Sequence, residues 1–106
     1  MSTEPIVLTI EVMPSDCNFV IGMVSASCCL SKSIVGDMSA NVKNWTIGGE
    51  LEKYSQLIDD ALEIAKDRLI VKAKKRKAKA IIGVRIGTTQ VSEGAAEVII
   101  YGTAVN

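Results

Sequence analysis

Three cysteines are the residues in this sequence best suited to holding a metal ion. Cys28 and Cys29 are adjacent, and Cys17 precedes them in a segment rich in turn-forming residues. Thiolates favour soft ions such as Zn²⁺ and Cu(I), so Cys28 and Cys29 are candidate ligands of a soft metal ion. Side chains of neighbouring residues in a strand point to opposite faces, however, and a structural site normally takes four ligands at spacings such as C-x-x-C. We therefore favour the interpretation that both cysteines are small buried hydrophobic residues. A metal site remains an alternative if a ring of copies multiplies one cysteine by symmetry.

Several kinds of catalytic site are excluded by composition. The sequence contains no histidine, so Ser-His-Asp and Cys-His arrangements are impossible. It has neither of the glycine-rich motifs that cradle phosphates. Asp59 and Asp60 are neighbours on a predicted helix and point about 100° apart, so they do not form a catalytic pair. We therefore expect a protein that is not an enzyme.

Composition and charge indicate a small protein of the cytoplasm. The 106 residues are enough for one domain, residues 1–106, with 12 basic and 12 acidic residues. The basic run at residues 74–79 has no aromatic residues among it for base stacking, and we interpret it as a solvated helix end, with no nucleic-acid partner. There is no signal-peptide pattern, no apolar run of about 20 residues for a membrane span, and an odd number of cysteines. We expect a cytoplasmic protein that does not bind a membrane.

The chain is organised around one long predicted helix. From residue 50 onward, apolar residues recur at three- and four-residue spacing for about 25 residues without glycine or proline, which predicts an amphipathic helix. Gly48 and Gly49 would form a flexible corner before it. Acidic residues fill its first half and basic residues its second half, which complements the helix dipole.

The remaining segments predict four strands. Apolar residues alternate at residues 6–12, which predicts a strand with one buried face. Further strands are expected at residues 19–30, 80–87 and 95–105. The last two would form a hairpin across the polar residues 88–94. Gly22 suggests a bulge in the second strand. A short helix, capped by Ser33, is possible between residues 31 and 47.

These elements predict an α+β fold in the order β-β-α-β-β, with a four-stranded curved sheet, antiparallel or mixed, covered by one long helix. A single helix covers only one face of such a sheet, yet Ile81 and Ile82, like Ile99 and Ile100, place apolar side chains on both faces. A lone subunit would expose more apolar surface than soluble proteins usually tolerate. We therefore predict a homo-oligomer, with Ile81, Ile99 and Tyr101 as candidate interface residues.

Several blocks of the sequence resemble one known family. They are Ile21-Gly22-Met23-Val24-Ser25, Gly48-Gly49, Tyr54, the alanines at 61, 65 and 73, residues 78–84 and Gly102-Thr103-Ala104-Val105. Together they resemble the YbjQ-like family, whose description is putative heavy-metal binding, over about residues 20–105. The resemblance implies a dodecin-like fold, a long helix on a curved sheet, and assembly into ring-shaped pentamers.

Two positions depart from the pattern of that family. Glu50-Leu51 stands where the family usually has Arg-Ser after the double glycine, which removes the basis for an anion or ligand site there. Lys77 stands where the family favours a glycine, the residue that usually adopts the left-handed conformation at a helix end.

Two hypotheses for function follow from the residues and the resemblance together. The first is a homo-oligomer that binds a soft metal ion through Cys28 or Cys29, presented repeatedly around a ring. The second is an oligomeric module that holds a small molecule or a protein partner at its subunit interfaces.

Overall fold

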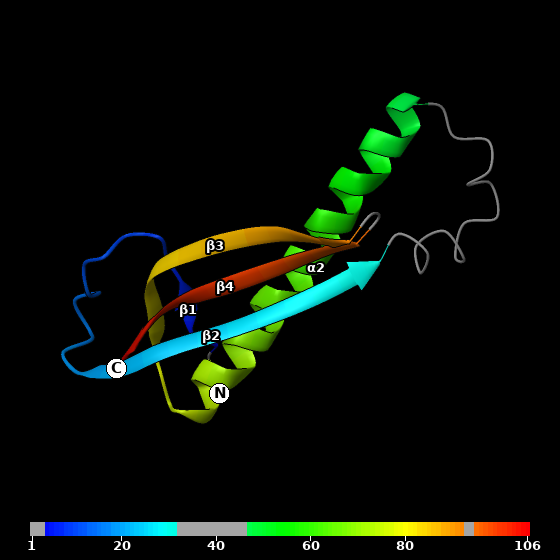
Figure 1. The fold of residues 1–106 in the computed structure, drawn as a ribbon. Helices are drawn as coiled ribbons and strands as arrows, with labels where there is room; N and C mark the ends of the chain where they lie inside the picture. The colour runs from blue at the N-terminus through cyan, green and yellow to red at the C-terminus, as the bar shows by residue number, and fades with distance from the viewer. Residues whose placement is uncertain (1–3, 32–46, 93–94) are drawn as a thin grey trace.

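A computed structural model describes residues 4–31, 47–92 and 95–106 (Figure 1). It confirms the α+β class and the β-β-α-β-β order. The elements are β1 (Ile6–Val7), β2 (Val20–Ser31), α2 (Ile47–Lys75), β3 (Ala80–Ser92) and β4 (Ala95–Val105). The possible short helix between residues 31 and 47 lies outside the described residues.

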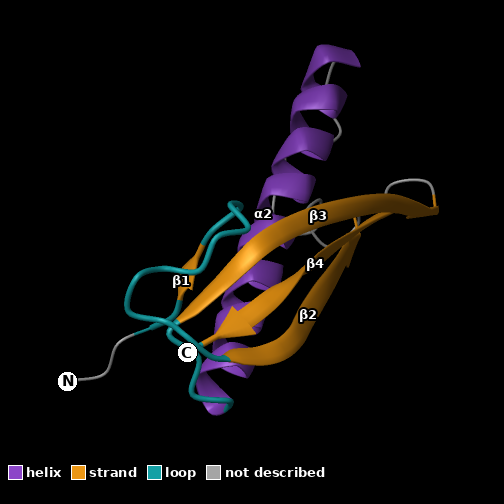
Figure 2. Ribbon diagram, turned by 90° about the vertical axis from the view of Figure 1, so that its left-hand side faces the viewer, coloured by secondary structure: helices purple, strands orange, loops and turns teal. Residues whose placement is uncertain are grey.

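The four strands form one mixed sheet in the order β1-β3-β4-β2. β4 pairs antiparallel with both β2 and β3, whereas β1 runs parallel to β3. Figure 2 shows β1 and β2 at the two edges of the sheet, with α2 crossing behind it. β2 is therefore an edge strand, with one side of its backbone directed away from β4.

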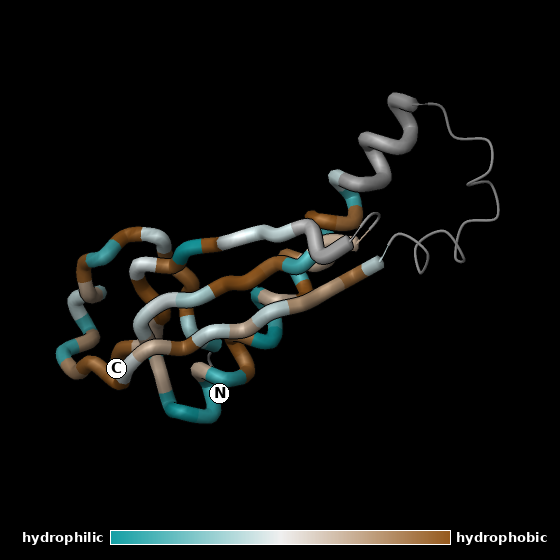
Figure 3. Tube along the Cα trace, viewed as in Figure 1, coloured by the Kyte–Doolittle hydropathy of each residue, from teal (hydrophilic) through white to brown (hydrophobic). Residues whose placement is uncertain are grey.

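α2 packs on β2 and β4 along a narrow stripe. Leu57, Ala61, Ala65, Leu69 and Ala73 recur every four residues and are almost fully buried. Three of the five are alanines, and their small side chains let the helix backbone lie close to the sheet. Val98 and Ile100 of β4 complete this core from the other side, and Figure 3 shows the apolar stretch along the middle of β4.

The helix starts earlier than predicted. It begins at Ile47 and spans 29 residues, so Gly48 and Gly49 lie inside its first turn. The prediction of a flexible glycine corner is therefore wrong. Glycine at a helix start costs less than in a helix interior, because the first backbone N–H groups have no intrahelical partner in any case.

The helix ends in a Schellman motif built around Lys77. The Ala78 N–H donates to the Ala73 carbonyl at 3.1 Å, and the Lys77 N–H donates to the Lys74 carbonyl at 2.9 Å. Lys77 has a φ of 64°, the left-handed conformation that glycine usually supplies. Asn106 supports the turn by donating from Nδ2 to the Lys77 carbonyl at 2.8 Å.

The first predicted strand is mostly absent. Only Ile6 and Val7 are strand, although Leu8 and Ile10 continue to exchange backbone hydrogen bonds with β3. The prediction that one face of residues 6–12 is buried is also wrong, since Ile6, Ile10 and Val12 are 59%, 56% and 72% exposed. We call residues 4–12 the N-terminal arm. It lies along the outer edge of β3.

The β3–β4 hairpin confirms the predicted pairing but not its length. β3 continues to Ser92, so residues 88–92 belong to the strand and not to a loop. The predicted bulge in β2 is present: its register with β4 shifts between Val20 and Gly22, and Gly22 has a φ of 141°.

Part of the sheet face opposite α2 is covered by the chain itself. The segment after the N-terminal arm folds over this face, where Cys17 packs in a small cluster with Ala80, Ile82 and Val105. Leu8 and Met13 pack against the same cluster. The remainder of this face, toward the β3–β4 turn, we call the open face.

Candidate functional site

Cys28 and Cys29 lie on opposite faces of β2. Cys28 is buried in the core beneath α2, whereas Cys29 is exposed on the open face. The two thiols cannot bind one metal ion together while β2 remains extended. Of these two candidate ligands, only Cys29 is placed where an external metal ion can reach it.

Cys29 has a carboxylate directly beside it. Glu97 is its register partner on β4, and Thr89 of β3 is the register partner of Glu97. Directly opposed residues have Cβ atoms about 4.5–5.5 Å apart, so a thiol and a carboxylate share one small area of the open face. The Thr89 hydroxyl donates a long hydrogen bond of 3.4 Å to Glu97 Oε1. One copy therefore offers one sulfur and one carboxylate at this point.

Cys17 belongs to a different environment. It is buried with Ala80, Ile82 and Val105 on the sheet face opposite α2, at the end distant from the β3–β4 turn. Burial raises the pKa of the Cys17 thiol, and the neighbouring Asp16 carboxylate raises it further, against a smaller opposing effect of Lys79. A thiol held in its protonated form is a poor metal ligand and a poor nucleophile.

The sheet face that carries Cys29 and Glu97 also exposes apolar residues, all on the side of this pair that is distant from the β3–β4 turn. Met23, Ile99 and Tyr101 are 67%, 37% and 41% exposed. Ser25 and Ser27 alternate with them as the register partners of Tyr101 and Ile99, so this face is mixed and less apolar than predicted. Ile81, the third candidate interface residue, is fully buried in the core under α2, and its side chain offers no surface to a second copy.

The outer edge of β2 carries a row of basic side chains that was not predicted. Arg68, Lys72 and Arg76 donate to the carbonyls of Ser27, Ser25 and Met23, at 2.8, 2.8 and 2.9 Å. Four residues advance about 6 Å along a helix, and two residues advance about 6.8 Å along a strand. Because these two lengths are similar, a basic residue at every fourth position of α2 lies beside every second carbonyl of β2. The sequence shows the four-residue spacing of these three basic residues. It does not show that they bind the carbonyls of β2, because no pattern in the sequence identifies β2 as an edge strand.

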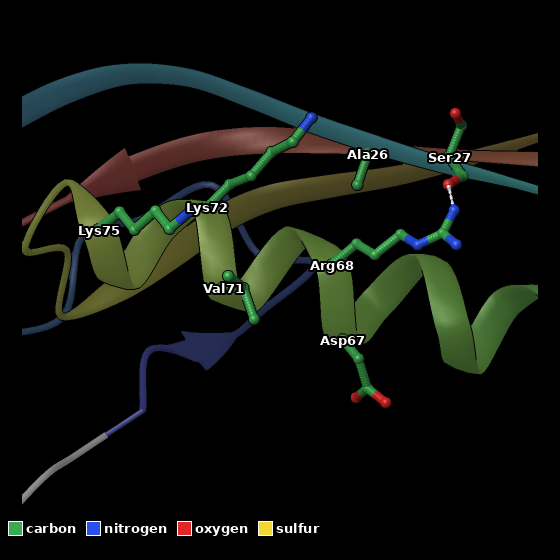
Figure 4. A pocket seen from close by; sticks show the side chains of 7 residues that line it. All are labelled: Ala26, Ser27, Asp67, Arg68, Val71, Lys72 and Lys75. Atoms are coloured by element: carbon green, nitrogen blue, oxygen red, sulfur yellow. Dashed lines mark hydrogen bonds between the residues drawn. The ribbon is translucent and has the colours of Figure 1, made fainter.

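A groove runs between this basic row and the edge of β2. It has a volume of about 490 Å³, and Figure 4 shows its lining by Ala26, Ser27, Asp67, Arg68, Val71, Lys72 and Lys75. A second hollow continues along the same edge toward Met23 and Arg76 and shares Lys72 and Lys75 with the first. We call the two together the β2 groove. It combines basic side chains with the exposed apolar side chain of Val71.

Within the described part of the chain, no three potential metal-ligating residues gather at one place. The described helix is long but not apolar enough to cross a membrane. A metal site built from the open face would need ligands from more than one copy.

Comparison with known proteins identifies relatives over nearly the whole chain. A family model with the description putative heavy-metal-binding, YbjQ type, matches residues 6–106. A UPF0145 protein from Thermus thermophilus is 38% identical over 103 residues, which are 96% of this chain and 90% of that protein. A UPF0145 protein from Archaeoglobus fulgidus is 39% identical over 106 residues, covering 99% of this chain and 97% of that one.

A solved structure shares the fold. The crystal structure of a DUF74-family protein of unknown function from Pediococcus pentosaceus superposes with a TM-score of 0.64 at 19% identity, covering 95% of each chain. The resemblance in sequence, the family match and the relatives in bacteria and archaea agree. The chain belongs to the YbjQ family, described as putative heavy-metal-binding.

Proposed function

We propose that the protein is a homo-oligomeric, cytoplasmic binding protein for a soft metal ion, without enzymatic activity. Its copies would surround a common centre and turn their open faces toward it, as in the pentameric ring that the family resemblance implies. The observation that carries this proposal is the position of Cys29: it is exposed beside Glu97 on a face that also exposes Ile99 and Tyr101.

Symmetry supplies what a single copy lacks. Soft ions such as Zn²⁺ and Cu(I) prefer thiolate ligands, usually three or four donors in all. One copy offers Cys29, with Glu97 as an additional oxygen donor. Copies arranged around an axis bring several Cys29 thiols to the same region, so the ligand set is completed by assembly.

Assembly also accounts for the apolar residues of the open face. Met23, Ile99 and Tyr101 would be removed from water by neighbouring copies, at about 25 cal/mol for each Å² of apolar surface buried. Replacing Ile99 or Tyr101 with Asp should place a charge in this contact and yield monomers or insoluble protein. Ile86→Asp is the matched control, since Ile86 is exposed but lies on the α2 side of the sheet, opposite Ile100.

Native mass spectrometry with metal titration tests the proposal. The wild-type protein should appear as a defined oligomer and take up Zn²⁺ or Cu(I). Cys29→Ser should lose this uptake, and Cys28→Ser, which changes a buried thiol on the other face, should keep it. A wild-type protein that stays monomeric at high concentration would refute the assembly. Equal metal uptake by wild type and Cys29→Ser would refute the metal site, and a retained small organic molecule would favour an oligomeric ligand-binding module instead.

A further inference from the structure

Cys29 and Glu97 form a narrow pair across two neighbouring strands. Opposed residues of an antiparallel sheet alternate between hydrogen-bonded and non-hydrogen-bonded pairs, whose Cα atoms lie about 5.5 Å and about 4.5 Å apart. The Ser25 and Ser27 carbonyls point away from β4, toward basic side chains of α2, so both residues belong to non-hydrogen-bonded pairs. The register of β2 with β4 is regular from Gly22 to Ser31, and Cys29 follows Ser27 by two residues. Cys29 and Glu97 therefore also form the narrower kind of pair.

The side chains of this narrow pair suit one shared metal ion. A tetrahedral Zn²⁺ ion binds a thiolate sulfur at about 2.3 Å and a carboxylate oxygen at about 2.1 Å, which places the two donors roughly 3.6 Å apart. Side chains that start from Cα atoms about 4.5 Å apart reach this separation by rotation about their own bonds. One copy thus supplies a sulfur and an oxygen to the same ion, and a second copy completes a set of four donors.

Thr89 positions the carboxylate of Glu97. Its hydroxyl donates to Glu97 Oε1 at 3.4 Å, and among the described residues no donor lies within hydrogen-bond distance of Oε2. Carboxylates that bind a metal ion are usually held by a hydrogen bond of this kind from a neighbouring residue. We therefore treat Thr89 as a positioning residue for Glu97.

No basic side chain of the described residues balances the charge of Glu97 on this face. The residues in the register rows on either side are uncharged: Ser27, Ile99 and Gly87 in one row, and Ser31, Ala95 and Ser92 in the other. Arg85 lies two rows away and is already ion-paired with Glu11 at 2.7 Å. Copies that bring these faces together gather thiols and carboxylates, and a divalent ion offsets twice as much of that negative charge as a monovalent ion does.

We propose that the open face binds a divalent ion of the Zn²⁺ type and that Glu97 determines its preference for this class over Cu(I). Zn²⁺ accepts sulfur and oxygen donors together, whereas Cu(I) is softer, carries a single charge and gains little from a carboxylate. Cys29 binds either ion, but Glu97 strengthens the binding of the divalent one only. The inference rests on the metal-binding function proposed above and names the class of ion.

Metal affinities of matched variants test the role of Glu97. Glu97→Gln keeps the shape of the side chain and its acceptor for Thr89 but removes the charge. Glu63→Gln is the matched control, the same substitution at an exposed residue of α2 whose ion pair with Lys66 is long, at 3.6 Å. Competition with coloured chelators, without oxygen and with a reductant that is not a thiol, measures the affinity of each protein for Zn²⁺ and for Cu(I).

Glu97→Gln should weaken Zn²⁺ binding by at least about tenfold and leave Cu(I) binding unchanged, while Glu63→Gln should change neither. Cys29→Ser should weaken the binding of both ions. An unchanged Zn²⁺ affinity in Glu97→Gln, or equal losses for the two ions, would overturn this inference and leave the proposed metal site intact. A wild-type protein that binds neither ion would instead refute the proposed function itself.

A second pair of variants covers the case in which Glu97→Gln misfolds, as judged by circular dichroism. Thr89→Val removes the hydroxyl that holds Glu97 and leaves the charge in place, so Zn²⁺ binding should weaken by about tenfold. Thr88→Val is its control, because Thr88 is paired with Val98 and lies on the other face of the sheet. Equal Zn²⁺ affinities of these two variants would overturn the inference.

Discussion

Lys77 occupies a backbone conformation that suits glycine better than lysine. Its φ of 64° places the Cβ atom close to the backbone, and such a conformation costs a non-glycine residue about 1 kcal/mol. The Schellman hydrogen bonds of Lys77 and Ala78 fix the turn nonetheless. The backbone hydrogen bonds of this turn and the bond from Asn106 to the Lys77 carbonyl therefore define the helix end, although no glycine is present there.

Lys77→Gly should raise the free energy of unfolding by about 1 kcal/mol, since glycine adopts this conformation without the steric cost. Urea denaturation followed by circular dichroism measures the change. Lys66→Gly is the matched control: Lys66 lies inside α2, where glycine should lower the free energy of unfolding by about 1 kcal/mol. Destabilisation by both substitutions would contradict the assignment of Lys77 to the left-handed cap.

The three cysteines should differ in reactivity because their environments differ. In the native protein at mildly alkaline pH, iodoacetamide should modify the exposed Cys29 first and spare the buried Cys28. Cys17 is also protected, and its raised pKa keeps it protonated as the pH increases, so its labelling should begin at a more alkaline pH than that of an ordinary exposed thiol. Mass spectrometry of peptides locates the modified residues.

Unfolding should remove these differences. In guanidinium chloride all three cysteines should react at comparable rates, which provides the control for accessibility. Rapid labelling of Cys28 in the native protein would contradict its placement beneath α2.

At the scale of the elements, Gly102 sets how closely β4 and β3 pack. A Cβ atom at Gly102 would lie 2.9 Å from Ile81 Cγ2, from Val84 Cγ2 and from the Ile82 carbonyl oxygen. The last of these is backbone and cannot move aside without distorting the hairpin. The glycine is therefore required by close packing, in the same sheet where Gly22 is required by its positive φ.

Gly102→Ala should lower the free energy of unfolding by about 1–3 kcal/mol, the usual cost of overpacking a core. Gly87→Ala is the matched control, because no atom lies within 4 Å of the Cβ it would add. It should be neutral or slightly stabilising. Chemical denaturation measures both, and equal effects of the two substitutions would contradict this account of Gly102.

The edge of β2 shows how helix and sheet support each other. An uncovered edge strand exposes unpaired backbone groups that promote aggregation. Here Arg68, Lys72 and Arg76 satisfy outward carbonyls of β2. The same side chains that protect this edge also make it basic.

At the scale of the whole molecule, the proposed assembly makes a prediction about salt. The contact proposed through Ile99 and Tyr101 of the open face is mainly apolar, and salt screens only interactions between charges. Raising NaCl from about 0.05 M to about 0.5 M should therefore leave subunit association unchanged or strengthen it, as measured by analytical ultracentrifugation. Association that weakens strongly with salt would indicate a contact dominated by charged side chains instead.

The sequence by itself determined the helix, the hairpin, the order of elements and the absence of histidine chemistry. Apolar spacing from Leu57 to Ala73 defines one helix face, and alternation in residues 95–105 defines a strand, because both patterns are local and repeat over many residues. The opposed faces of Cys28 and Cys29 also followed from local geometry, since adjacent residues in any strand alternate.

Only the tertiary structure decided what lies at the edges and on the second face of the sheet. The alternation at residues 6–12 predicted a buried strand, but the arm has only β3 on one side, so Ile10 and Val12 remain exposed. Burial of Ile81 and exposure of Cys29 likewise depend on which face α2 covers. The β2 groove could not be predicted from the sequence for the same reason. The order of the strands in the sheet depends on contacts between residues far apart in the chain, whereas periodicity describes only residues close together in the sequence.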